Sequence, residues 1–366
     1  MERMYEYWLA CLKGIGSERK KQLRERAGSA KALYYIEETE KQVGILVNDS
    51  EKQAIGTGRK NWDLKREYEK LEKAGIRMVI KGEKEYPVRM RKLAGMPYAL
   101  YVKGNLPKED GMTAAIVGAR KCTAYGEVMT LKIAERLVQC GIQIVSGMAR
   151  GIDGAGHRGA LNAGGSTYAV LGCGADICYP REHRGLYEDI LKRGGILSEL
   201  PPGAPPLPQH FPARNRLISA LADVVLVMEA REKSGSLITA DMALEQGRDV
   251  YALPGPINSS LSRGCNQLIR QGAGIITGAE DLPLDLGILQ KNSSSGIKKK
   301  TEETKIMLET TENMVYSNLD LFAKNQEELL RLTHLAPQEL SRALVSLELK
   351  GYIEERSKNY YVRREK

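Results

Sequence analysis

The sequence predicts an α/β protein, with a parallel sheet in the middle of the chain, a helical region before it and a winged helix after it. Short apolar runs alternate with amphipathic helical patterns, as right-handed βαβ crossovers require. Glycine is concentrated at 76–290, where 28 of the 37 glycines lie, which is typical of tight turns between strands and helices. We therefore expect domains at 1–75, 76–288 and 313–366, joined by a flexible linker at 289–312.

Residues 1–75 have the pattern of short helices. Tyr7, Trp8, Leu9 and Leu12 make an apolar face, and the segment KGIG at 13–16 then interrupts the helical pattern. Such a segment between two helices is similar to the turn of a helix-hairpin-helix or SAM-type domain, whose backbone amides can face a phosphate. The alternative is a small helical domain in which glycine only turns a corner.

Seven apolar runs predict the strands of the central sheet. They read AAIVG, IQIVSG, TYAVLGCG, GILSEL, VVLVMEA, DVYALPG and GIITG, at 114–118, 142–147, 167–174, 195–200, 224–230, 249–255 and 274–278. Runs that are apolar throughout suit a sheet that is covered by helices on both faces. Because ligands of such sheets bind outside the carboxyl ends of the strands, the loops that follow these runs are the candidate site.

The C-terminal segment predicts a winged helix. The Ser-, Lys- and Glu-rich stretch at 289–305 comes first, two helical patterns then meet at Ala336-Pro337, and 352–364 reads as a two-stranded wing. Winged helices commonly bind nucleic acid, but others dimerise or dock proteins. Both readings stay open, although the wing and its approach are basic at Lys350, Arg356, Lys358, Arg363 and Arg364.

The net charge of +9 indicates a polyanionic partner only weakly. The charge is spread evenly, with +3 at 1–75, +4 at 76–290 and +2 at 291–366, so any anion site must form by folding. No apolar run approaches the ~18 residues of a membrane span, and the N-terminus does not read as a signal peptide. Six dispersed cysteines are typical of a reduced compartment. We expect a cytoplasmic protein that does not bind membranes.

Five loops at the predicted strand ends carry cations, hydroxyls or free amides. The first two follow the strands at 114–118 and 142–147, and the third contains a tyrosine beside arginine. In the fourth, a proline-rich loop is expected to bring an Arg-Asn-Arg segment to the start of a helix, and the fifth enters a helix with lysine, serine and glycine. The candidate anion-binding residues are Gly118, Arg120, Lys121, Ser146, Gly147, Arg150, Gly151, Tyr179, Arg181, Arg214, Asn215, Arg216, Lys233, Ser234, Gly235 and Ser236.

Five loops that can each bind an anion are expected at one edge of the sheet, which favours an extended polyanion as the ligand over a small molecule. Phosphates can bind at glycine turns and helix starts, arginine can fork onto them, and an aromatic ring such as that of Tyr179 can stack on a base. The alternative is that these are ordinary turns between strands and helices, with arginines that simply face solvent.

Other motifs do not support catalysis or a cofactor. The GAGHRG segment at 154–159 matches the dinucleotide-binding pattern but lies inside a predicted helix, without the acidic residue expected ~20 positions later. The dipeptide Gly-Lys never occurs, which excludes a Walker A motif. Cys173 and Cys178 have no second ligand pair for zinc, and the four histidines form no close pair. We expect no enzyme activity, no cofactor and no metal.

Several motifs together resemble the DNA processing protein A (DprA/Smf) family. They lie in order at 86–105, 116–120, 144–161, 179–190, 197–203, 211–255 and 264–273. The resemblance covers at least residues 80–285 and implies an extended Rossmann-like domain. A preceding helical domain and a following winged helix also occur in longer members of the family.

The resemblance implies a single-stranded DNA-binding mediator that acts as a homodimer, displaces single-strand-binding protein and loads the RecA recombinase during natural transformation or recombination. The family's DNA contacts would fall on the five loops above, with Arg181 in place of the usual lysine. Ala119 stands where the family usually has Ser or Thr, so no side-chain hydroxyl is available there. The family's dimer face would fall at about Val250 to Ile276.

Two other function classes stay open. One is a nucleotide-processing enzyme of the lysine-decarboxylase-like phosphoribohydrolase type. Enzymes of that type carry PGGxGT before the corresponding helix, where this chain has KSGSLIT from Lys233 on. The other is a winged-helix transcription factor, for which we would expect tight binding to one double-stranded site.

Overall fold

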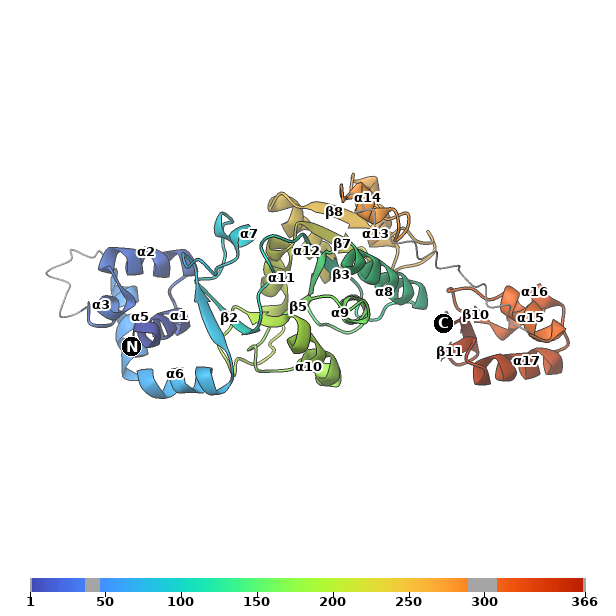
Figure 1. Ribbon diagram of the computed structural model, residues 1–366, viewed down its shortest axis with the longest axis horizontal. Coiled ribbons are helices and arrows are strands. Elements are labelled where there is room, and N and C mark those ends of the chain that lie inside the picture. The colour runs from blue at the N-terminus through green and yellow to red at the C-terminus, as the bar shows by residue number, and fades with distance from the viewer. Residues whose placement is uncertain (1, 37–46, 289–307, 365–366) are drawn as a thin grey trace, which may run out of the picture. The chain divides into compact units, whose positions relative to one another are not determined.

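The computed structural model describes residues 2–36, 47–288 and 308–364 (Figure 1). These residues form two compact units, one with the N-terminal helices and a nine-stranded sheet, the other with the winged helix. Residues 289–307 of the expected linker lie outside the described residues.

Short helices make up the described N-terminal region. They are α1 (Glu2–Cys11), α2 (Ser17–Ala27), α3 (Ala30–Tyr34), α5 (Asp49–Lys60) and α6 (Leu64–Lys73). The apolar face expected around Trp8 is buried, and it shares one hydrophobic core with Tyr101 and Ile196 of the sheet. Glu6 accepts hydrogen bonds from Arg24 and from the Tyr98 hydroxyl, the latter at 2.6 Å. These contacts fix the helices to the edge of the sheet.

All seven predicted strands are present. The sheet consists of β1 (Arg77–Ile80), β2 (Ala99–Gly104), β3 (Thr113–Val117), β4 (Gln143–Ser146), β5 (Thr167–Val170), β6 (Gly195–Ser198), β7 (Val224–Val227), β8 (Asp249–Ala252) and β9 (Gly274–Ile275). Their order is β1-β2-β6-β5-β4-β3-β7-β8-β9. From β6 to β9 every neighbouring pair is parallel, with Ile116 opposite Leu226 and Val145 opposite Tyr168. From β3 the chain first adds β4, β5 and β6 on one side and then returns to add β7, β8 and β9 on the other side. Sheets of this class bind their ligands at the point between the two halves, here between β3 and β7.

Helices cover both faces of the sheet. They are α7 (Val88–Arg91), α8 (Ala124–Gln139), α9 (Ile152–Asn162), α10 (Arg184–Arg193), α11 (His210–Leu221), α12 (Gly235–Glu245), α13 (Arg263–Arg270) and α14 (Leu282–Asp285), with the 3₁₀ turn η1 (Arg181–His183) before α10. Helices α9 and α10 pack together on one face and α11 and α12 on the other (Figure 1).

Two features differ from the sequence-based expectation. Strands β1 and β2 were not predicted, and they extend the sheet in antiparallel fashion from β6. The helix after the proline-rich loop begins at His210, so the Arg-Asn-Arg segment lies within α11 and not at its start. Pro212 is tolerated in the first turn because the backbone N–H groups there have no partner within the helix.

The second unit is a winged helix, as predicted. It contains α15 (Thr310–Ser317), β10 (Lys324–Asn325), α16 (Gln326–Thr333), α17 (Pro337–Leu349), β11 (Ile353–Ser357) and β12 (Tyr360–Arg363). The expected turn at Ala336-Pro337 joins α16 and α17. The wing hairpin gains a third strand, because β10 pairs with β12.

Candidate nucleic-acid interface

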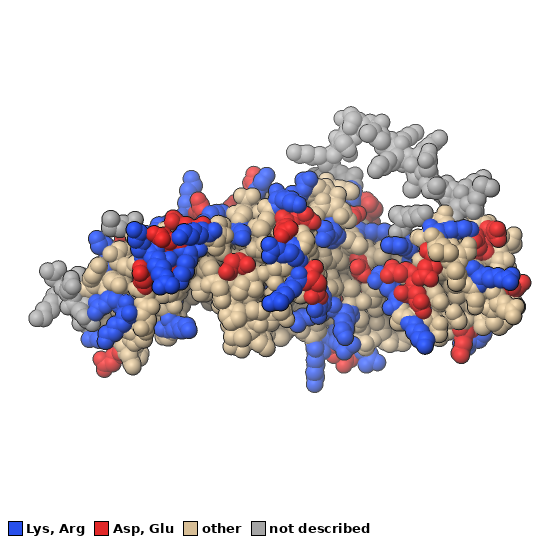
Figure 2. Space-filling view, turned by 90° about the horizontal axis from the view of Figure 1, so that it is seen from below, with Lys and Arg blue, Asp and Glu red and all other residues tan. Residues whose placement is uncertain are grey.

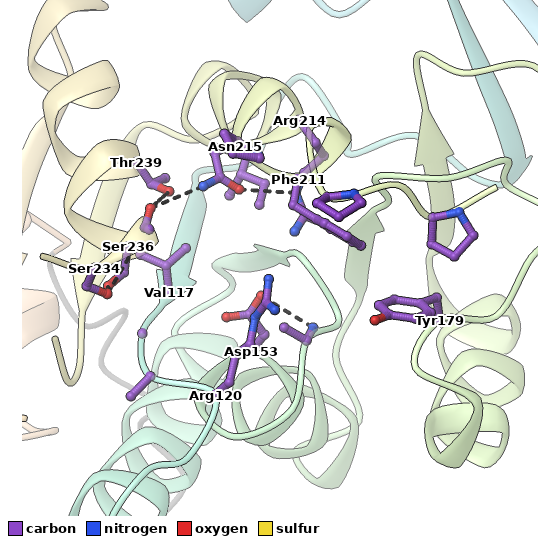
Figure 3. A pocket seen from close by; sticks show the side chains of 18 residues that line it. Val117, Arg120, Asp153, Tyr179, Phe211, Arg214, Asn215, Ser234, Ser236 and Thr239 are labelled. Carbon is purple, nitrogen blue, oxygen red and sulfur yellow. Dashed lines mark hydrogen bonds between the residues drawn. The ribbon is translucent and has the colours of Figure 1, made fainter. Parts of the chain in front are cut away.

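A pocket of about 480 Å³ opens at the carboxyl ends of β3 and β4, next to the reversal of strand order (Figure 3). Its walls come from the turn after β3, the first turn of α9, the start of α11 and the start of α12. Eight predicted residues line it: Gly118, Arg120, Tyr179, Arg214, Asn215, Ser234, Gly235 and Ser236. A smaller pocket beside it adds Gly147 and Arg150.

One wall of the pocket combines a cation with aromatic rings. The Arg120 guanidinium carbon lies 5.5 Å from the centre of the Phe211 ring, which is the geometry of a cation–π contact. The Tyr179 ring lies 5.5 Å from the same ring, with 32° between the planes, and is 42 % exposed. Nucleic-acid bases stack on surfaces of this kind, and the guanidinium can bind a phosphate beside them.

The opposite wall is polar and lies at the start of α12. Ser234 caps this helix, and its hydroxyl lies 2.7 Å from that of Ser236. Asn215 donates from Nδ2 to the Gly235 carbonyl oxygen at 3.2 Å, and Thr239 donates to the same oxygen at 3.3 Å. Hydroxyls at a helix N-terminus favour a phosphate or the polar edge of a base.

Arg214 lies on the floor of the pocket and is only 5 % exposed. Its Nη1 donates to the Gly147 carbonyl oxygen at 2.9 Å and also to the Val170 carbonyl oxygen. Asp153, which is also buried, accepts from the N–H groups of Gly147 and Ala149 at 3.1 and 3.4 Å. Burial raises the pKa of Asp153, and the positive charge of Arg214 opposes this shift.

Two more of the predicted arginines carry ion pairs with carboxylates from other loops. Arg150 donates to Glu182, and both side chains are exposed. Arg216 donates to Glu199 in a half-buried pair. Arg150 therefore has a competing partner in the free protein, whereas Arg216 is held on the side of α11 toward Glu199.

Arg181, Lys121 and Lys233 are exposed, and none of them has an ion pair among the described residues. None lines the main pocket, although Lys233 borders a separate open basin. Across the face in Figure 2, Lys and Arg are interspersed with Asp and Glu. The overall excess charge is therefore not gathered into one patch on this face.

Ser146, Gly147 and Gly151 support the loops from inside. Ser146 is fully buried and donates to the Ile116 carbonyl oxygen at 2.5 Å. Gly147 has no room for a side chain, because a Cβ there would lie 2.6 Å from the Arg214 guanidinium. Gly151 has a positive φ of 69°, and a Cβ added to it would lie 2.3 Å from the Ala119 carbonyl oxygen. Only glycine fits this conformation and this approach.

Sequence reasoning missed Phe211 and Thr239. Phe211 is one of only two phenylalanines in the chain and immediately precedes the Pro-Ala-Arg-Asn-Arg segment, which was a usable signal. Thr239 lies one turn into α12, and the expected Lys-Ser-Gly-Ser segment ended before it. Among the described residues no group of three His, Cys, Asp or Glu side chains could hold a metal ion. None of the described helices is long and apolar enough to cross a bilayer.

Fold and site together define a class: a Rossmann-like α/β protein with a basic, aromatic-lined pocket at the strand ends, followed by a winged helix. A sequence profile described as DNA recombination-mediator protein A matches residues 77–287, and one described as DprA winged helix domain matches 300–357. The chain belongs to the DNA recombination-mediator protein A (DprA/Smf) family.

Relatives and solved structures agree with this assignment. Protein Smf of Escherichia coli is 44 % identical over 213 residues, which are 58 % of this chain and 57 % of that protein. The X-ray structure of DNA processing protein A from Streptococcus pneumoniae has a TM-score of 0.61 at 33 % identity, covering 77 % of this chain and 97 % of the other. The structure that describes a single-stranded DNA binding mode of DNA processing protein A from Helicobacter pylori has a TM-score of 0.52 at 31 % identity, covering 58 % and 95 %.

Proposed function

We propose that this protein binds single-stranded DNA as a recombination mediator. The observation that carries the proposal is the pocket wall in which Arg120, Phe211 and Tyr179 lie together. Aromatic rings can stack only on bases that are not already stacked in a duplex, whereas phosphates are available in either form. A relative from Helicobacter pylori has a described single-stranded DNA binding mode, which supports the same ligand here.

The strand would lie along the carboxyl ends of β3, β4, β5 and β7. Arg120 and Arg181 would contact phosphates, and the hydroxyls of Ser234 and Ser236 would bind a phosphate or a base edge. Lys121 and Lys233 would add exposed charge on either side of the pocket. Such contacts carry little sequence information, so we expect binding to DNA of any sequence.

Assembly and partners are proposed by analogy with the family. We propose a homodimer formed at the far edge of the sheet, at about Val250 to Ile276, where Ile275 is exposed and the strand β9 is last in the order. Exposed apolar side chains at a sheet edge favour pairing with a second chain. We further propose displacement of single-strand-binding protein and loading of RecA, in natural transformation or in general recombination, with the protein acting in the cytoplasm.

The site favours binding over catalysis. Among the described residues, Asp153 is the only carboxylate that lines the main pocket, and it is held by two backbone N–H groups beside Arg214. Its carboxylate is therefore already engaged in supporting the loop, which favours a structural role over that of a general base. Release of free base from nucleoside monophosphates at enzyme-like rates would instead support the phosphoribohydrolase alternative.

The proposal is tested by binding to fluorescent single-stranded oligonucleotides of random sequence at several salt concentrations. We expect Arg120→Ala and Arg181→Ala to weaken binding and to reduce the slope of log affinity against log salt by ~0.7 each. Arg26→Ala, an exposed change in α2, is the matched control. Unchanged binding in both site variants would contradict the proposal, and tighter binding to duplex DNA would favour a transcription factor. Faster RecA filament formation would test the mediator role.

A further inference from the structure

We propose that Arg214 is a positioning residue that holds three DNA-binding loops in place, and that it does not contact the phosphates. This inference rests on the proposed function. Arg214 belongs to the Arg-Asn-Arg segment whose charge suggests a DNA contact, yet it is 5 % exposed, less than any other arginine among the candidates. Most of this side chain is covered by protein, and its Nη1 is already engaged by two backbone carbonyl oxygens.

The hydrogen bonds of Arg214 join the ends of two neighbouring strands. Nη1 donates to the carbonyl oxygen of Gly147, the residue after β4, and to that of Val170, the last residue of β5. These carbonyls begin the two loops that carry Arg150 and Tyr179. Buried backbone carbonyls need a hydrogen-bond donor, and a donor from α11 that binds both of these oxygens fixes the spacing of the two loops.

Asp153 makes the buried charge tolerable and reinforces the same loop. It accepts from the N–H groups of Gly147 and Ala149. It also lies close enough to Arg214 for each charge to favour the ionised form of the other. In the segment 147–153, Arg214 therefore binds the Gly147 carbonyl oxygen, and Asp153 binds the N–H groups of Gly147 and Ala149.

The same segment supports the loop that carries Arg120. The Ile152 N–H donates to the Ala119 carbonyl oxygen at 3.2 Å, and Gly151 leaves no space between itself and the backbone of Ala119 and Arg120. A shift of the segment 147–153 would thus move Arg120 as well. Through this chain of contacts one buried side chain determines where Arg120, Arg150 and Tyr179 lie.

Gly147 provides a second way to disturb the arrangement without removing Arg214. A Cβ at this position would lie 2.6–2.7 Å from the guanidinium atoms of Arg214. Because these distances are too short for real contacts, Gly147→Ala requires the guanidinium or the backbone of residue 147 to shift, and we expect this shift to disturb the hydrogen bonds to the two carbonyls. If Arg214 acts by position, Gly147→Ala and Arg214→Met have the same phenotype, although only one of them removes a charge.

The test measures two properties of Arg214→Met, Gly147→Ala and Arg120→Ala: amide hydrogen exchange of the free protein, and single-stranded DNA affinity over a salt series. We expect the first two variants to speed exchange at 147–152 and 171–174 but not in β8. They should bind about tenfold more weakly, since loops must then be ordered on binding, with the wild-type salt slope. Arg120→Ala should reduce the slope and leave exchange unchanged.

Three results would overturn the proposal. The first is a slope reduced in Arg214→Met as much as in Arg120→Ala, with normal exchange, which would make Arg214 a phosphate contact. The second is faster exchange throughout the sheet, including β8, which would indicate general destabilisation. The third is wild-type exchange and affinity in Gly147→Ala. If the wild-type protein does not bind single-stranded DNA, the proposed function fails, while the exchange measurement still decides whether Arg214 orders the loops.

Discussion

The guanidinium of Arg120 lies over the ring of Phe211, with 5.5 Å between its carbon and the ring centre. The two residues are far apart in the sequence, one in the turn after β3 and the other in the first turn of α11. Their contact holds a cation and a stacking surface side by side before any ligand arrives. A nucleotide can therefore place its phosphate and its base against this pair at the same time.

Phe211→Ala should weaken single-stranded DNA binding by ~1–3 kcal/mol, which is the usual contribution of one stacked base. The loss should be similar for all four bases, because each has a face that can stack. Fluorescence anisotropy with homopolymeric oligonucleotides measures it. Phe211→Tyr, which keeps the ring, serves as the control and should bind nearly as well as the wild type. Equal affinities of Phe211→Ala and wild type would exclude a stacking role.

Glu182→Gln should strengthen single-stranded DNA binding. The Glu182 carboxylate pairs with Arg150 and repels phosphates nearby, so its neutralisation frees a cation and removes a negative charge. Exposed ion pairs contribute at most about 1 kcal/mol, and we expect a gain of up to about fivefold at low salt. The pair Arg150→Ala/Glu182→Gln is the control, in which this gain should disappear. Weaker binding of Glu182→Gln would instead show that Glu182 positions Arg150 for its ligand.

His157 should make stability depend on pH. Burial lowers the pKa of His157 to about 3. Its Nδ1 lies 2.6 Å from Thr167 Oγ1, which donates to the Ile144 carbonyl oxygen, and burial favours the neutral ring in the folded protein. Below pH 6.5 only the unfolded chain takes up this proton. The stabilisation is therefore present above pH 6.5 and is lost as pH falls toward 3, by ~1.4 kcal/mol per pH unit.

Urea denaturation of wild type and His157→Gln at pH 7.5, 6 and 5 tests this prediction. The wild type should lose about 2 kcal/mol more than the variant between pH 7.5 and 5. The difference between the two proteins is informative even where the substitution itself is destabilising. Parallel pH dependences would mean that His157 becomes protonated in the folded state.

Arg89→Ala should destabilise the fold without affecting the binding site. Arg89 donates to both carboxylate oxygens of Asp223 at 2.9 Å and to the Gly111 carbonyl oxygen at 2.6 Å. These contacts lie at the amino ends of β3 and β7, away from the pocket. Loss of a largely buried partner costs roughly 3–5 kcal/mol, which thermal unfolding can measure. Single-stranded DNA affinity should stay within twofold of wild type, and a tenfold loss would contradict this separation of roles.

The sheet was predictable because its signal is local. Each of the seven strands from β3 to β9 is a short apolar run followed by a turn and a helical pattern, and all of them formed. Strands β1 and β2 escaped prediction because they lie outside the repeating strand–helix pattern: β2 pairs with β6 and β1 with β2, both in antiparallel fashion. The predicted start of α11 was wrong, because a proline in the first turn of a helix, such as Pro212, does not end the helix.

The candidate site was only partly predictable. Sequence reasoning located the loops, because the carboxyl ends of parallel strands lie at one edge. It could not orient side chains within α11, where Arg214 points into the floor and Asn215 toward the α12 wall (Figure 3). A one-residue step along a helix turns a side chain by about 100°, and only the packing of the helix decides which residue is buried.

The sequence by itself determined the class of sheet, the edge at which the polar loops gather and the family. These follow from hydrophobic period and from motif order, which are properties of neighbouring residues. Only the tertiary structure decided which arginines are available to bind a phosphate. Arg150 pairs with Glu182, Arg216 with Glu199, and Arg214 is buried beside Asp153, whereas Arg120 lies over Phe211. The carboxylates come from other loops of the chain, and charge–charge interactions depend on distance in space.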